Sequence, residues 1–157
     1  MFGPRSAKGR YSTREADEAA QVAREWVRKG DNDLKNAAFA LQMEEECPTD
    51  TVCFHAQQCV EKYLKALLVL LAVDFPRTHD IRRLLMFLPP DLASALSPAD
   101  QERLTDYAVA TRYPGDYEPI SLKEARRAVQ LARAIRRAPR KVLPKEVTRR
   151  NRRSTGH

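Results

Sequence analysis

Long apolar runs are missing from this 157-residue sequence. No stretch approaches the roughly 20 consecutive apolar residues that a membrane-spanning helix needs, and the first residues carry charges but no apolar core of a secretory signal. No segment alternates apolar and polar residues long enough to indicate a β-strand, and no repeat of about 20 to 50 residues occurs. We therefore expect a soluble, cytoplasmic, all-α protein without a membrane partner, built as one domain because the chain is too short for two.

Cysteine is also scarce, with only Cys47, Cys53 and Cys59 present. Their six-residue spacing fits neither a CxxC knuckle nor a helical ligand pair at three or four residues, so we expect no metal site. An odd number of cysteines in a cytosolic chain is typical of reduced thiols, with Cys53 and Cys59 serving as small apolar fillers. No cofactor is expected.

Positive charge is unevenly distributed along the chain. The net charge is +7, but residues 136–153 contain nine Lys or Arg against Glu146 alone, so residues 1–135 together carry about −1. This pattern predicts a mobile N-terminal segment (1–13), a helical domain (14–138) and a basic, disordered tail (139–157). Such a tail can bind RNA or another polyanion, but without sequence selectivity.

Apolar periodicity and capping residues predict a four- to five-helix up-and-down bundle. The expected helices are 13–45, a second from Asp50 to about Val73, a short third after Thr78 or Asp80 that stops at Pro89, a fourth from Ser97 to the Arg112 loop, and a fifth from Ser121 to about residue 138. Ser121 and Glu124 form a capping box. Gly30 in the first helix indicates either close packing of a neighbouring helix or a local break. Val22 and Trp26 are placed on the packing face of that helix.

The second helix has two chemically different faces. Val52, Ala56, Val60 and the residues that follow at three- and four-residue steps form an apolar side. The polar side contains His55, Gln58, Glu61, Lys62 and Lys65. Its simplest interpretation is a solvated face on which Glu61 and Lys65 form a favourable (i, i+4) pair.

Several motifs occur in an order that resembles the HEPN family of small prokaryotic helical domains. They are Glu25-Trp26, Asp33-Leu34, His55-Ala56-Gln57-Gln58, Glu61-Lys62, Lys65-Ala66-Leu67-Leu68, Thr78-His79-Asp80 and Arg112-Tyr113-Pro114. The resemblance covers roughly residues 20–138. It implies a helical bundle, a two-fold homodimer, a nucleotide or RNA ligand, and a minimal nucleotidyltransferase as possible partner.

Ribonuclease members of that family use an Arg followed after four to six residues by a His. Arg112 matches the arginine by position and by its Tyr-Pro neighbours, but no His follows before His157. A general acid or base for RNA cleavage should titrate near neutrality, which Asp116 and Tyr117 do not do without large perturbation. The resemblance therefore favours phosphate binding by Arg112 over catalysis.

The remaining candidate site residues would support Arg112. Tyr113 and Tyr117 could stack on a base or ribose, while Lys62, Lys65 and His55 could add charge or ligand contacts. His79 has a simpler structural interpretation at a helix N-terminus.

Three functions stay open at this point. The first is a nucleotide- or RNA-binding partner subunit of a minimal nucleotidyltransferase, in a toxin–antitoxin-like pair. The second is an active, metal-independent toxin ribonuclease in which Arg112 works with His55 or His79. The third is a homodimeric interaction module without a ligand.

Overall fold

A computed structural model describes residues 11–108, 115 and 118–140, with the side chains of 138–140 left aside. Its elements are α1 (Thr13–Leu41), the 3₁₀ turn η2 (Glu44–Glu46), α2 (Thr49–Leu70), α3 (Ile81–Leu85), α4 (Pro90–Ala93), α5 (Pro98–Asp106) and α6 (Leu122–Arg140). No strand occurs among these described residues, so the prediction of an all-α helical bundle is confirmed. Within the same part of the chain, no helix is long and apolar enough to cross a membrane.

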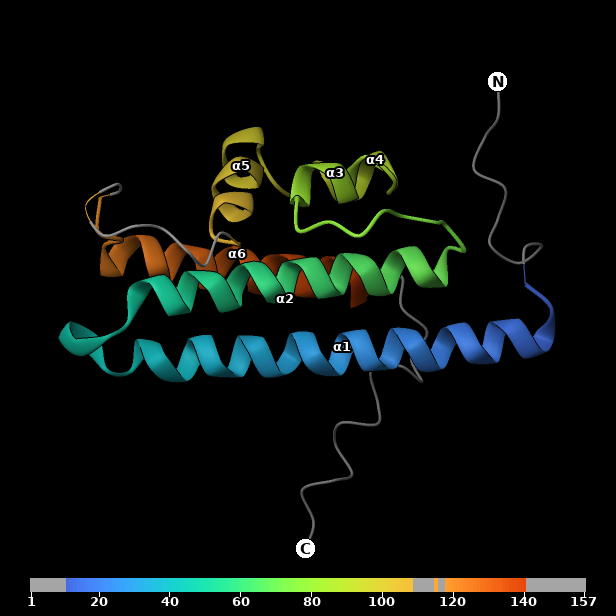
Figure 1. The fold of residues 1–157 in the computed structure, drawn as a ribbon, viewed down its shortest axis with the longest axis horizontal. Helices are drawn as coiled ribbons and strands as arrows, with labels where there is room; N and C mark the ends of the chain where they lie inside the picture. Colours follow the sequence, from blue (N-terminus) through green and yellow to red (C-terminus); the bar gives the residue numbers. More distant parts are fainter. Residues whose placement is uncertain (1–10, 109–114, 116–117, 141–157) are drawn as a thin grey trace, which may run out of the picture.

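The three long helices lie side by side, and α2 is the central one. Helices α1 and α2 run antiparallel, whereas α6 runs in the same direction as α2 (Figure 1). Two contacts fix that direction: Thr49 Oγ1 donates to Ile120 O at 2.7 Å near the starts of α2 and α6, and Tyr63 contacts Arg136 near their ends. The short helices α3, α4 and α5 return the chain across α2, which leaves α2 covered on most of its circumference.

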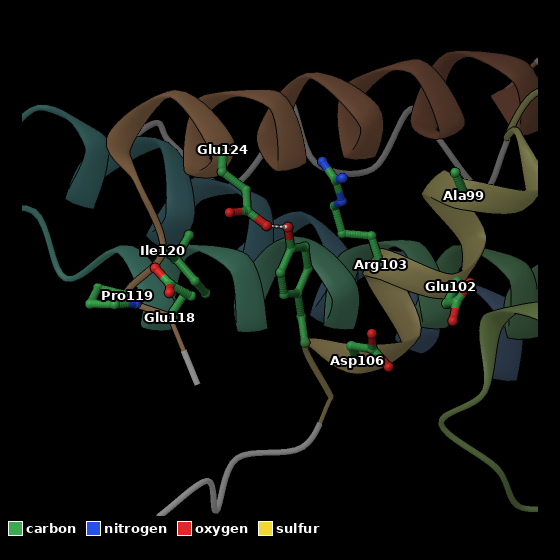
Figure 2. Close-up of a pocket in the computed structure, with 9 residues that line it drawn as sticks. Ala99, Glu102, Arg103, Asp106, Glu118, Pro119, Ile120 and Glu124 are labelled. Carbon is green, nitrogen blue, oxygen red and sulfur yellow. Dashed lines mark hydrogen bonds between the residues drawn. The ribbon is translucent and has the colours of Figure 1, made fainter. Parts of the chain in front are cut away.

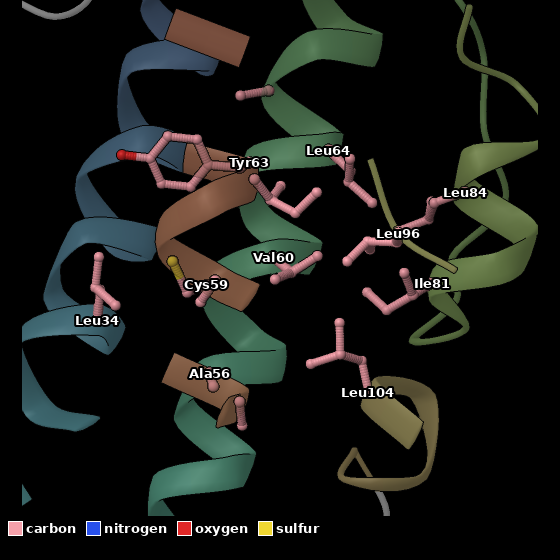
Figure 3. Close-up of a cluster of buried hydrophobic side chains, with 14 of the residues drawn as sticks. Leu34, Ala56, Cys59, Val60, Tyr63, Leu64, Ile81, Leu84, Leu96 and Leu104 are labelled. Carbon is pink, nitrogen blue, oxygen red and sulfur yellow. The ribbon is translucent and has the colours of Figure 1, made fainter. Parts of the chain in front are cut away.

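The core is built around α2. Its fully buried side chains include Val60, Tyr63, Leu64 and Leu67, which share one apolar cluster with buried residues of α1, α3, α5 and α6 (Figure 3). Leu92 and Ala93 of α4 are partly buried against this cluster. Buried members of this cluster from the other helices include Ala23, Val27, Leu34, Ala37, Ile81, Leu84, Leu104, Ala125, Val129 and Ala132. The buried residues of α1 include the small side chains Ala19, Ala23 and Ala37 and also Gly30, which lets α1 approach α2 closely.

Helix starts follow the local sequence signals. Ser12 Oγ accepts from Glu15 N at 3.3 Å while Glu15 Oε2 accepts from Ser12 N at 3.0 Å, a complete capping box at the predicted start of α1. Ser97 caps α5, which has Pro98 at its first position. At α6, Ser121 Oγ accepts from Glu124 N at 3.1 Å, but the Glu124 carboxylate accepts from Tyr107 instead.

Several helix ends differ from the predicted ones. The first helix ends at Leu41. Three residues later, Glu44 adopts a left-handed φ of 52° and begins a separate turn. Pro90 is the first residue of α4, in addition to following the end of α3. The amide hydrogen of a first helical residue has no partner within the helix, so proline, which lacks that hydrogen, fits this position. Helix α5 ends at Asp106, and α6 continues to Arg140, past the predicted limit at 138.

The two predicted flanking segments lie mostly outside the described residues. Of segment 1–13, only Tyr11, Ser12 and Thr13 are described, and Tyr11 donates to Val69 O at 2.8 Å. The tail beyond residue 140 is not described. Mobility of the N-terminal segment and disorder of the tail stay predictions.

Two predicted faces are wrong. Val22 is 48% exposed, because the packing row of α1 is centred one position away on Ala19, Ala23 and Val27. The polar side of α2 is not a solvated face: Glu61 and Lys65 are buried, because α1 and the α2–α3 loop cover it.

Gly30 allows the close approach of α1 and α2. A Cβ atom at this position would lie 2.9 Å from Tyr63 Cδ2 and 3.4 Å from Cys59 O, while α1 continues unbroken through the glycine. The Tyr63 ring cannot move aside easily, because its hydroxyl donates to Asp31 and accepts from Arg136 Nε at 3.0 Å. The sequence-based alternative of a break at Gly30 is therefore wrong, and close packing is confirmed.

Gly30→Ala should lower the free energy of unfolding by about 1–2 kcal/mol, since overpacking costs about 1–3 kcal/mol and alanine regains up to about 1 kcal/mol of helix propensity. Urea unfolding measures the change. Asn32→Ala, at the exposed neighbouring turn, is the matched control and should leave stability unchanged or slightly higher. A Gly30→Ala protein that is more stable than the parent would contradict the close-packing argument.

The cysteines behave as fillers of the core. Cys53 and Cys59 are fully buried and Cys47 is half-buried, all as free thiols. Burial raises the pKa of both Cys53 and Cys59 to about 12, so neither forms a thiolate near neutral pH.

We expect a thiol-reactive disulfide reagent to modify only Cys47 quickly in the folded protein, and all three cysteines in guanidinium chloride. The absorbance of the released thiolate measures both values. Cys47→Ser should abolish the fast phase. A second fast thiol in the folded protein would show that the core around α2 opens readily.

Candidate functional site

Two adjoining depressions lie where α5 meets the start of α6, and both are lined by Arg103 and Glu124. The first, here called the acidic depression, has a volume of about 410 Å³. Its lining residues are Ala99, Glu102, Arg103, Asp106, Tyr107, Glu118, Pro119, Ile120 and Glu124 (Figure 2). Four carboxylates thus face one guanidinium there.

Tyr107 is held in place inside the acidic depression. Its hydroxyl donates to Glu124 Oε1 at 2.6 Å, a bond that ties the end of α5 to the first turn of α6 (Figure 2). Burial, and then the Glu124 carboxylate, raise the pKa of Tyr107 well above its ordinary value. Tyr107 therefore stays neutral and acts as a fixed aromatic wall, not as an acid or base.

The second depression, here called the basic depression, has a volume of about 580 Å³. It is lined by Arg103, Ser121, Lys123, Glu124, Arg126, Arg127 and Gln130. Four cations therefore face one carboxylate, and three of them sit on the first two turns of α6, where the helix dipole also favours an anion. Arg127 is partly engaged by Asp100, with Nη2 at 3.3 Å from both carboxylate oxygens.

The predicted phosphate-binding loop begins and ends at the acidic depression. Tyr107 precedes this loop and Glu118 follows it, and both line the depression. Arg112, Tyr113 and Tyr117 lie outside the described residues, so their part in the site stays a prediction.

The other predicted site residues lie elsewhere, on the polar side of α2. Lys62 Nζ donates to Asp33 Oδ2, and His55 Nδ1 lies 2.9 Å from Asp33 Oδ1. Lys65 Nζ is 2.7 Å from Glu61 Oε1 and 5.4 Å from the centre of the Trp26 ring. Both ammonium groups are thus bound to carboxylates between α1 and α2, and their role in binding phosphate stays a prediction.

Glu61 is the centre of this buried polar cluster. Its carboxylate accepts from Lys65 at 2.7 Å and from Gln57 Nε2 at 2.8 Å, and His79 Nδ1 lies 3.1 Å from both oxygens. Burial alone would raise the pKa of Glu61, but the hydrogen bonds from Lys65, Gln57 and His79 outweigh it and hold the pKa below its ordinary value. The carboxylate is therefore ionised near neutral pH.

His79 also links the α2–α3 loop to α2 through its backbone. Its carbonyl oxygen accepts from Gln57 Nε2 at 3.2 Å, while its side chain is 72% exposed. Asp80 provides the N-cap of α3, accepting from Arg82 N at 2.9 Å and Arg83 N at 3.3 Å. The structural interpretation of Thr78-His79-Asp80 accounts for these contacts.

Sequence reasoning missed the cations of the basic depression. Arg103, Lys123, Arg126 and Arg127 are not among the predicted site residues, because none of them belongs to the motifs that resemble the HEPN family. The sequence does contain a signal for them. Lys123 follows a helix-capping serine, and Arg126 and Arg127 lie three and four residues after Lys123, on the same side of the helix. Among the described residues, no group of three or more His, Cys, Asp or Glu is placed to hold a metal ion.

This arrangement, a central buried helix with a charged site at the α5–α6 junction, defines a class of small helical domain. The family model of the HEPN domain matches residues 23–142, so the chain belongs to the HEPN domain family. The chain is also similar to the crystal structure of TT1696 from Thermus thermophilus, with 28% identity and a TM-score of 0.59. That match covers 76% of this chain and 96% of the other. No curated protein matches.

Glu61→Gln should lower the free energy of unfolding at neutral pH by about 3 kcal/mol, because it leaves buried Lys65 without its partner. The pKa of Glu61 is lowered by folding, so its contribution is present above about pH 4.5 and is lost as pH falls through the folded-state value. The variant should therefore lose less stability than the parent as the pH falls below about 4.5.

Urea unfolding at several pH values measures both effects. Glu25→Gln is the control, because Glu25 is an exposed carboxylate whose pKa is also lowered, by the hydrogen bond and charge of Arg28. Solvent screens that pair, so its removal should change little. Parallel pH profiles for the parent and Glu61→Gln would show that the buried cluster does not determine acid stability.

Proposed function

We propose that this HEPN protein binds the phosphate groups of a nucleotide or RNA in the basic depression between α5 and α6. The observation that carries the proposal is the convergence of Arg103 with Lys123, Arg126 and Arg127 at the N-terminal end of α6. Guanidinium groups suit phosphate because they donate two parallel hydrogen bonds and remain charged. A volume of about 580 Å³ is in the range of small-molecule sites.

The neighbouring acidic depression gives the site a second part. Phosphate is repelled by its carboxylates, whereas ribose hydroxyls and base amino groups can donate hydrogen bonds to them. Tyr107 offers an aromatic wall whose ring is fixed by the bond to Glu124. Arg112, with Tyr113 and Tyr117, completes the proposed site from the loop between Tyr107 and Glu118.

Binding is favoured over RNA cleavage. Neither His55 nor His79 lines either depression, and each imidazole is bonded to a carboxylate, Asp33 or Glu61. Cys53 interacts with Tyr107 and Glu124, so its side of α2 is the one that faces the depressions. His55 is two residues further along the same helix. Since successive helical residues are about 100° apart, His55 points to the opposite side of α2 from the depressions.

The protein acts in this proposal as a partner subunit of a minimal nucleotidyltransferase, in a toxin–antitoxin-like pair, and as a homodimer. Exposed apolar side chains support a role in assembly: Met86 and Phe87 protrude after α3, with Met86 83% exposed.

Replacing Arg126 or Arg103 by Gln should weaken binding of a fluorescein-labelled single-stranded RNA or a fluorescent nucleotide about tenfold, which corresponds to about 1.4 kcal/mol. For RNA, each lost phosphate contact should also reduce the salt slope by about 0.7. Fluorescence anisotropy across a salt series measures both values. Arg14→Gln is the control, because Arg14 lies in the first turn of α1, at the other end of the bundle, and all samples keep the basic tail.

Equal affinity in all four proteins would overturn the proposal. The same RNA samples, run on a denaturing gel, report cleavage. Cleavage that is lost in Arg112→Ala would favour the ribonuclease alternative.

A further inference from the structure

The solvent-facing side of α6 carries a row of positive charge. Four cations and one amide follow one another there at alternating three- and four-residue steps: Lys123, Arg126, Gln130, Arg133 and Arg137. Residues at such steps share one face of a helix, and all five side chains are exposed. On the other side of α6, Ala125, Val129 and Ala132 are buried in the core. We call the five exposed residues the α6 row.

The α6 row extends beyond the basic depression. Its first three members line the depression, whereas Arg133 and Arg137 are not among the lining residues. At 1.5 Å per helical residue, Arg137 lies about 16 Å beyond Arg126 along the axis, and the whole row is about 21 Å long. A mononucleotide whose phosphates occupy the depression therefore leaves the far end of the row without an anion.

The positive charge of the row is not balanced by neighbouring acids. Glu124 is the single acidic residue of α6, and its half-buried carboxylate accepts from Tyr107. Among the described residues, no ion pair includes a cation of the α6 row. By contrast, Arg14 and Arg28 on α1 each pair with a glutamate of the same helix. Like charges at these steps repel one another, so an anion laid along the row relieves a repulsion that α6 otherwise carries.

The helix beneath the row is fixed near both of its ends. Just before α6 begins, Ile120 O accepts from Thr49 Oγ1 of α2 at 2.7 Å. Near the last member of the row, Arg136 Nε donates to Asp31 at 2.9 Å and to the Tyr63 hydroxyl at 3.0 Å. The backbone that carries the cations is therefore already in position, which reduces the cost of ordering it when a ligand binds.

We infer that the ligand of the basic depression is a single strand of RNA whose backbone continues along the α6 row. The inference rests on the phosphate site proposed above and chooses between the two ligands named there. One line of cations matches the successive phosphates of one strand, and a positively charged surface that follows the backbone is typical of single-strand binding. Gln130, in the middle of the row, offers an amide that can bond to a phosphate oxygen or a 2′-hydroxyl.

Arg133→Gln combined with Arg137→Gln tests the part of the row outside the depression. Binding of a fluorescein-labelled oligouridylate of about 12 nucleotides should weaken about tenfold. The salt slope should fall by about 1.4, because each lost phosphate contact removes about 0.7. Affinity for a fluorescent ATP analogue should stay unchanged. Fluorescence anisotropy across a salt series measures all three values on the full chain, so the basic tail contributes equally to every sample.

Two further variants complete the comparison. Lys29→Gln with Lys35→Gln removes the same charge from exposed positions of α1 and is the matched control, which should bind both ligands as the parent does. Arg126→Gln lies inside the depression and should weaken both ligands. All of these positions are exposed, and circular dichroism checks the fold.

These measurements separate the inference from the phosphate site. If Arg126→Gln weakens both ligands while the Arg133 and Arg137 variant binds RNA as the parent does, the inference is wrong and the phosphate site stands. If Arg126→Gln changes neither ligand, both are wrong. The inference is also overturned if the control loses as much RNA affinity as the row variant, if the row variant loses ATP affinity equally, or if a hairpin RNA duplex binds more tightly than the single strand.

Discussion

The close contact of α1 with α2 at Gly30 and Tyr63 is the constraint on which the rest of the bundle depends. The tyrosine ring fills the space that a Cβ atom at residue 30 would need, and its hydroxyl joins Asp31 on α1 to Arg136 on α6. One side chain thus sets the spacing of two long helices and the position of the third. The start of α6, which carries the basic depression, is anchored to the start of α2 by a second contact, from Thr49 Oγ1 to Ile120 O.

Buried charge in this protein serves mainly to join elements. Asp31 and Arg136 connect α1 to α6, Asp33 binds His55 and Lys62 of α2, and Glu61 holds the α2–α3 loop through His79. Each of these buried carboxylates has an opposite charge and a further hydrogen bond, which is the condition for tolerating burial. Within the described part of the chain, cations gather instead in the basic depression, and carboxylates gather in the neighbouring acidic depression.

The candidate site is formed by segments that are distant in the sequence. Arg103 is near the end of α5, while Lys123, Arg126 and Arg127 belong to α6, and the loop between them contains Arg112. The bond from Tyr107 to Glu124 closes this junction and separates an acidic depression from a basic one. A phosphate ligand would meet attraction on one side of Glu124 and repulsion on the other, which favours one orientation.

Local sequence signals were sufficient for the helical class, for the starts of α1, α5 and α6, and for the close packing at Gly30, because capping and apolar periodicity act within a few residues. They also led to the HEPN family. They could not show that Glu61 and Lys65 are buried, since an (i, i+4) pair has the same pattern on a solvated and on a covered face. Nor could they place Arg103 beside Arg126, because only the return of the chain through α3, α4 and α5 brings these side chains together. Burial and convergence depend on contacts between distant segments, and those contacts exist only in the folded bundle.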